Sequence, residues 1–154
     1  MSTPRTVDGV EGVKSLVGTE LGPTDWVEIT QDMVNLFADA TGDHQWIHVD
    51  VERAKKESPF GGPIAHGYLT LSLIPRFLPE LTTFTGFSMG INYGTEKVRF
   101  PSPGAVGSNV RARTVVDSVT DIPGGVQIQQ TVTFEVDGAT KPACVATIVV
   151  RQYV

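Results

Sequence analysis

Cysteine is almost absent from this sequence: Cys144 is the single example among 154 residues. One cysteine cannot form a disulfide within the chain, so the fold has to be stabilised by its core. Apolar residues surround Cys144 in a stretch typical of a strand, Ala-Cys-Val-Ala-Thr-Ile-Val-Val. We therefore predict a buried, unreactive thiol rather than a nucleophile.

Long apolar runs are missing as well. No stretch reaches the ~18 residues that a membrane helix needs. The first five residues, Met-Ser-Thr-Pro-Arg, contain no apolar segment of the kind found in secretory signals. The expectation is a cytoplasmic protein without membrane insertion.

Positive charge is scarce, because 12 lysines and arginines stand against 17 acidic residues, for a formal net charge of -5 and a pI of about 5.1. Nucleic-acid-binding proteins usually carry a basic surface, so we expect no nucleic-acid partner. A phosphate-bearing ligand remains compatible with this balance, since a few local cations can hold one.

The remaining composition, 40% apolar and 19% charged, is that of an ordinary folded domain. A chain of this length suits one domain that can bury roughly two-thirds of its surface. We predict this domain over residues 19–154. Residues 1–18 are predicted to be an N-terminal extension, helical because valines and Leu16 recur at helical spacing despite Gly9 and Gly12.

A strand or arm over residues 19–29 is expected to lead into a helix over residues 31–41. Thr30 stands in the N-cap position of that helix, before an apolar stripe. Gly42 is a natural end, since glycine accepts the left-handed conformation after a helix.

A second short helix over residues 51–57, capped by Asp50, and a loop over residues 58–63 come next. Residues 66–81 are apolar around almost the whole circumference of a helix, which is typical of a buried helix. Pro75 is expected to kink it, because proline lacks an amide donor and clashes with the preceding turn.

The rest of the chain is predicted to form four strands, over residues 87–100, 108–118, 126–136 and 143–150. Polar and apolar residues alternate in the second and third, whereas the fourth is apolar on both faces, as in a central strand. Antiparallel strands that cover one buried helix form an α+β layout.

A carboxylate and an imidazole stand five positions apart just after the predicted helix end. Because Gly42 ends the helix, loop geometry can bring Asp43 and His48 to one point, where both suit acid–base work on a water molecule. Each residue alone is more often structural, Asp43 in a turn and His48 as a hydrogen-bonded histidine. His44 is expected to face solvent, and the three residues lack the ligand spacing of a metal site.

A second motif, Phe-Gly-Gly-Pro-Ile-Ala-His-Gly over residues 60–67, delivers the chain into the buried helix. Free N–H groups at a helix start carry partial positive charge and can bind a carbonyl oxygen that becomes negative during a reaction. Gly67 lets a ligand approach this backbone closely. His66 is expected to order the loop, or to line the site.

These two motifs resemble those of MaoC-like (R)-specific enoyl-CoA hydratases, and the resemblance covers about residues 19–154. The hydratase motif of that family has an aromatic residue, Gly-Asp, and an aliphatic residue before His, and it also has a Pro-Ile-x-His-Gly entry to the central helix. Both are present here, as Phe37, Gly42, Asp43, Ile47 and His48, and as residues 63–67.

The resemblance implies a single hotdog domain, an antiparallel sheet wrapped around a long central helix, and a homodimer. It implies that Asp43 and His48 activate one water molecule, which adds to C3 of a trans-2-enoyl-CoA. The Gly67 amide binds the thioester oxygen, and the product is an (R)-3-hydroxyacyl-CoA. Neither a metal nor a redox cofactor is implied.

The chain departs from the family pattern at Gln45-Trp46, where Asn-Pro is usual. Gln45 could replace the hydrogen bonds of the asparagine, while the ring of Trp46 needs another residue to pack over it. Gln45 and His66 are therefore candidates for substrate binding. Lys97 and Arg99 are two apart on a predicted strand and could contact a CoA phosphate, although a solvated face is the default for such residues.

Two other functions remain open. A hotdog thioesterase would activate water against the thioester carbonyl and release CoA thiol. A partner subunit that binds acyl groups without turnover would be expected to lack the Asp or His of the motif, and both are present. Tyr68, Leu69 and Phe84 are expected in the core, where packing and acyl-chain contact can coincide.

Overall fold

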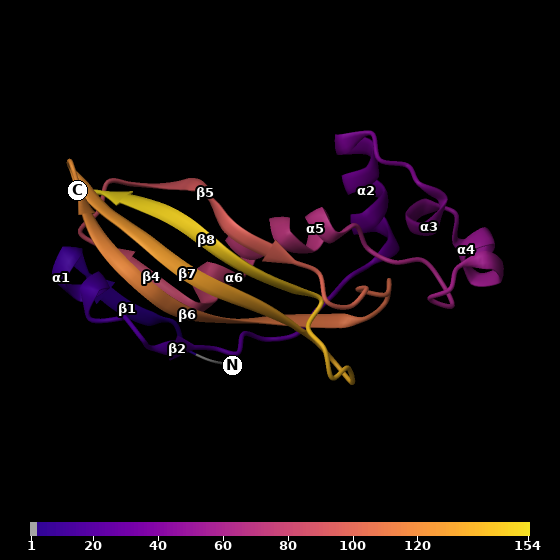
Figure 1. Cartoon of the computed structure of the whole chain (residues 1–154), viewed down its shortest axis with the longest axis horizontal. Helices are drawn as coiled ribbons and strands as arrows, with labels where there is room; N and C mark the ends of the chain where they lie inside the picture. The colour runs from indigo at the N-terminus through magenta and orange to yellow at the C-terminus, as the bar shows by residue number, and fades with distance from the viewer. Residues whose placement is uncertain (1–2) are drawn as a thin grey trace.

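The computed structural model describes residues 3–154 and contains a six-stranded antiparallel sheet (Figure 1). The strand order is β2-β6-β7-β8-β5, and β3 pairs with β6 beside β2. The predicted strands are all present, with β8 in a central position. The bounds are β2 (Glu20–Leu21), β3 (Val27–Glu28), β5 (Met89–Arg99), β6 (Asn109–Ile122), β7 (Gly125–Val136) and β8 (Cys144–Tyr153).

Two consecutive helices, α5 (Gly67–Ser72) and α6 (Ile74–Leu81), pack against one face of this sheet. Phe77 of α6 meets Phe134 of β7 edge to face, with ring centroids 5.6 Å apart. The predicted long helix is interrupted at Leu73, and Pro75 lies in the first turn of α6, where no N–H donor is needed. The α+β hotdog prediction is confirmed, with a central helix in two pieces.

The helix before the segment of Asp43 and His48, α2 (Gln31–Thr41), has the predicted ends. The Thr30 hydroxyl accepts a hydrogen bond from the Met33 N–H at 3.2 Å. Gly42 has φ of 79° and donates its N–H to the Ala38 carbonyl at 2.8 Å. The helix α4 (Val51–Glu57) also begins as predicted, because the Asp50 carboxylate accepts from the Arg53 N–H at 3.1 Å.

The helix predicted for the N-terminal extension is only partly present. Of residues 1–18, positions 1–2 lie outside the described residues. The first ordered element is a strand, β1 (Arg5–Asp8), which pairs in parallel with β4 (Thr82–Thr85). A helix, α1 (Gly9–Lys14), follows. Local periodicity missed β1 because its partner strand lies 77 residues further along the chain.

Residues of this extension form part of a second buried apolar cluster at one end of the sheet. Val7, Val13 and Leu16 pack there against β6 and β7, while the main cluster lies between the sheet, α5 and α6. Cys144 is fully buried in the main cluster, and this burial raises the pKa of its thiol to about 11. Among residues 3–154, no helix is both long and apolar enough to cross a bilayer.

Replacing the cap of α2 should lower stability. Thr30→Ala leaves the Met33 N–H without its acceptor, and we expect the free energy of unfolding to fall by about 1 kcal/mol in urea titrations. Thr30→Ser keeps the hydroxyl and should retain most of the stability. An equal loss in both variants would show that the hydroxyl does not cap the helix.

Candidate active site

The Asp43 carboxylate lies directly after the αL residue that ends α2. Its Oδ1 accepts a hydrogen bond from the Gln45 N–H at 3.3 Å, and its side chain remains 51% exposed. This is the turn role considered for Asp43 from the sequence. Because the turn uses Oδ1, it orients the carboxylate and leaves Oδ2 open toward the two histidines.

His48 lies in a one-turn helix, α3 (Trp46–Val49), and not in an open loop as its position after Gly42 suggested. Its ring is buried, and Nδ1 lies 2.6 Å from the Ile64 carbonyl oxygen. A carbonyl only accepts, so Nδ1 is the donor. In the neutral ring the lone pair is then on Nε2. The Gln31 amide donates to the His48 carbonyl at 2.8 Å and fixes this turn from α2.

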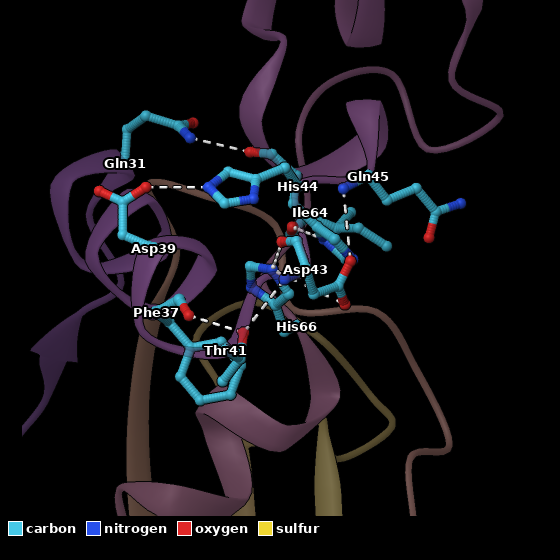
Figure 2. A network of polar contacts seen from close by, with 10 residues as sticks. Gln31, Phe37, Asp39, Thr41, Asp43, His44, Gln45, Ile64 and His66 are labelled. Carbon is cyan, nitrogen blue, oxygen red and sulfur yellow. Dashed lines mark hydrogen bonds and ion pairs between the residues drawn. The ribbon is translucent and has the colours of Figure 1, made fainter.

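His66 connects the two motifs. Its Nε2 donates to the Asp43 carbonyl oxygen at 3.0 Å, and its ring stacks on His48 with centroids 3.9 Å apart. Phe37 covers the ring from α2 at 4.8 Å. Figure 2 shows Asp43 and His66 facing each other inside this network. His66 therefore orders the loop, as expected, and it also forms one wall of the site.

The protonation of His48 follows from its surroundings. Burial lowers the pKa of His48 below its ordinary value of 6.5, because it disfavours the imidazolium. The bond to Ile64 opposes this, while the nearby His66 adds to the lowering. At pH 7 the ring is therefore neutral, with Nε2 able to accept a proton.

Asp43, His48 and His66 each place one ligand-type atom within 4.8 Å of the others. These are the residues that could hold a cation, a grouping that the sequence spacing did not indicate because His66 comes from another motif. However, one ring nitrogen of each histidine already bonds a backbone carbonyl, and the two rings are stacked. A gap of this size also suits one water molecule that bonds Asp43 and His48 together.

Gly67 is the first residue of α5, and its N–H has no acceptor within residues 3–154. A Cβ atom at this position would lie 3.1 Å from three carbon atoms of the Phe100 ring. A larger side chain at position 67 would therefore press on the Phe100 ring, which would have to shift by a few tenths of an ångström. No sequence pattern indicated this contact, because Phe100 follows β5, far from the second motif.

The pair Gln45-Trp46 is accommodated without separating Asp43 from His48. Gln45 acts through its backbone, since its carbonyl accepts from the His48 N–H at 3.0 Å. Its side chain points away from Asp43 (Figure 2). Trp46 starts α3 and is covered by the Arg53 guanidinium, 4.2 Å from the ring centroid.

Three other residues singled out from the sequence lie at the surface. His44 is exposed and bonds Asp39 at 2.9 Å, as expected of a solvent-facing residue, and this bond raises its pKa. Lys97 and Arg99 are exposed near the end of β5 that leads to Phe100. Nothing in the described contacts draws them into the cluster of Asp43 and His48.

A cavity of about 1070 Å³ lies between the two central helices and the sheet. Phe37, which contacts His66, lines it at one end, and Phe84 of β4 lines it as well. Leu71 of α5 and Leu78 of α6, which also pack against the main core cluster, line it in between. Part of the apolar surface of the central helix therefore faces the cavity as well as the core.

Comparison with known proteins agrees with this geometry. The model of the MaoC-like domain matches residues 13–139. The 3-hydroxyacyl-thioester dehydratase Z of Mycobacterium tuberculosis is 53% identical over 148 residues, covering 96% of this chain and 97% of that protein. Nodulation protein N of Rhizobium meliloti is 47% identical over 144 residues, covering 92% and 89%. The solved (R)-hydratase from A. caviae involved in PHA biosynthesis is 25% identical, with a TM-score of 0.71 and coverage of 87% and 94%.

The chain therefore belongs to the MaoC-like dehydratase family, and it is an enzyme of the hydratase and dehydratase class. The family resemblance seen in the two motifs is confirmed.

Removing the second imidazole should change the titration of the first. In His66→Gln, the pKa of His48 should move upward, because the positive charge that His66 can carry disappears and water gains access to the ring. NMR titration of the His48 ring protons measures this shift. His44→Gln is the control, since that exposed ring does not contact His48. An unchanged His48 pKa in His66→Gln would contradict the electrostatic coupling.

Proposed function

We propose that the protein is an (R)-specific enoyl-CoA hydratase, which adds water reversibly to a trans-2-enoyl-CoA and forms an (R)-3-hydroxyacyl-CoA. One observation carries this proposal. The free Nε2 of a neutral, buried His48 and the Asp43 carboxylate lie close enough to share one water molecule. The names of the M. tuberculosis and A. caviae relatives support the same chemistry.

In this scheme Asp43 and His48 orient the water, and His48 Nε2 accepts a proton from it. The hydroxide oxygen then bonds to C3 of the enoyl group, and a proton is delivered to C2, so that water is added without loss of atoms. In the reverse direction the same groups remove the proton and the hydroxyl group. The scheme uses no metal and no redox cofactor.

The charge that develops on the thioester oxygen needs a donor, and the free N–H of Gly67 supplies it in this proposal. Gly67 directly follows His66, which is stacked on His48, so the donor lies beside the acid–base pair. The acyl chain extends into the apolar cavity. Its volume of about 1070 Å³ slightly exceeds the ~300–1,000 Å³ typical of ligand pockets.

Candidate binding residues for the rest of the substrate follow from their charge and hydrogen-bonding groups. Lys97 and Arg99 are the candidate contacts for the phosphates of CoA, and Gln45 and His66 complete the candidate binding residues. The unpaired edge of β5, with Met89, Ile91 and Tyr93 exposed, gives a physical reason for the homodimer that we propose. A cytoplasmic location fits a CoA thioester substrate.

Substitution of either catalytic residue should remove turnover while the fold survives. We expect Asp43→Asn and His48→Ala each to lower the hydration rate of crotonyl-CoA by roughly 10²- to 10⁴-fold. The loss of enoyl absorbance measures this rate, and circular dichroism tests the fold. His44→Ala is the matched control from the same loop and should retain turnover.

Near-normal turnover in Asp43→Asn or His48→Ala would contradict the assignment. Release of free CoA thiol by the wild-type protein, with the double bond left intact, would indicate a thioesterase instead. A purified wild-type protein that hydrates nothing would indicate a partner subunit.

The rate should also depend on pH in a defined direction. His48 acts as the base in its neutral form, and its pKa is lowered from 6.5. The hydration rate should therefore be near its maximum at pH 7.5 and fall as the pH is lowered and His48 becomes protonated, with a midpoint below pH 6.5. A profile of kcat/KM against pH tests this, and a midpoint above pH 6.5 would contradict it.

A further inference from the structure

The N-terminal segment lies at the opposite end of the sheet from the catalytic residues. Figure 1 shows α1, β1 and β4 at one end, with α2, α3 and α4 at the other. Between these ends run α5 and α6, which line the cavity. The cavity therefore leads from the neighbourhood of His66 toward β4.

At that far end, β4 is held by the N-terminal segment. β1 pairs with β4 in parallel from Arg5 with Thr82 to Asp8 with Thr85. The Thr85 hydroxyl donates to the Asp8 carboxylate at 2.7 Å. β4 belongs to a two-stranded sheet in which β1 is its partner, so its position depends on the N-terminal segment.

Two apolar side chains separate the cavity from the cluster beneath the N-terminal segment. Phe84 lines the cavity and packs against the buried cluster that contains Val7, Val13 and Leu16. Ile128 of β7 also lines the cavity and is 1% exposed within the same cluster. Phe84 and Ile128 thus form a wall with the cavity on one side and the N-terminal segment on the other.

We propose that residues 5–16 set the length of the acyl chain that the enzyme accepts, by holding β4 so that Phe84 bounds the end of the cavity nearest β4. The inference rests on the proposed function, since it assumes that the cavity binds an acyl chain. A chain shorter than the cavity leaves apolar surface unburied, and each further methylene adds affinity until the chain reaches Phe84. A longer chain has to displace a ring that is packed on its other side, which is unfavourable in a dense cluster.

The chain offers a matched control for Phe84. The ring of Phe87 lies 6.4 Å from that of Phe84 and packs against the same cluster, but Phe87 does not line the cavity. Phe84→Ala and Phe87→Ala therefore remove similar packing, whereas only the first enlarges the cavity. Val7→Ala loosens β1 on the cluster without touching the cavity.

The experiment measures binding of saturated acyl-CoAs from butanoyl-CoA to palmitoyl-CoA by calorimetry, since these ligands lack the double bond and cannot be hydrated. In the wild type, affinity should rise with chain length and then stop rising. In Phe84→Ala the ratio of long-chain to short-chain affinity should increase about tenfold, the effect of burying two further methylenes. Phe87→Ala should leave the ratio unchanged, and Val7→Ala should shift it in the direction of Phe84→Ala by a smaller factor.

An unchanged ratio in Phe84→Ala, or an equal shift in Phe87→Ala, would overturn the role of Phe84. An unchanged ratio in folded Val7→Ala would overturn the role of the N-terminal segment. Failure of the proposed function is seen separately, as wild-type protein that binds acyl-CoAs but does not hydrate crotonyl-CoA. Thermal unfolding of each variant establishes that it is folded at the temperature of the measurement.

Discussion

The backbone of Ile64 connects the two motifs on which the site depends. Its carbonyl accepts the Nδ1–H of His48 at 2.6 Å, and its N–H donates to the Ile47 carbonyl at 3.0 Å. The first bond determines which nitrogen of His48 carries the lone pair, and the second holds α3 against the strand-like entry to α5. Because both bonds involve one residue, His48 and the start of the central helix are positioned together. His48, the stacked His66 and the start of α5 at Gly67 therefore meet at this junction.

The apolar residues of the interrupted central helix fall into two groups, according to what they contact. Leu69, Phe77 and Leu81 are buried and fill the core, as residues of a hotdog helix must. Leu71 and Leu78 pack against this core and also line the cavity, and Tyr68 is 71% exposed. The expectation of a core position was therefore correct for Leu69 and wrong for Tyr68, because one side of the helix faces the cavity.

The parts of the structure that could be predicted are those determined by interactions between residues close together in the sequence. The ends of α2 and α4 depend on capping groups that lie within four residues of the groups they bond, and the alternation in β6 and β7 is visible in consecutive positions. The predicted helix ends and the two predicted strands were therefore correct. The proximity of Asp43 and His48 could be predicted because they share one short segment. By contrast, β1 was read as helix because its hydrogen bonds go to β4, and neither the Phe100 ring over Gly67 nor the grouping of His66 with Asp43 is encoded in spacing. Contacts between distant segments become visible only once the chain is folded.

The single thiol of the protein makes its sheet open to direct measurement. Cys144 begins β8, between β7 and β5, and its pKa of about 11 leaves little reactive thiolate at neutral pH. Alkylating reagents therefore modify it only when the strands separate. The labelling rate at Cys144 then reports how often the start of β8 separates from β7, independently of the loops that carry Asp43 and His48.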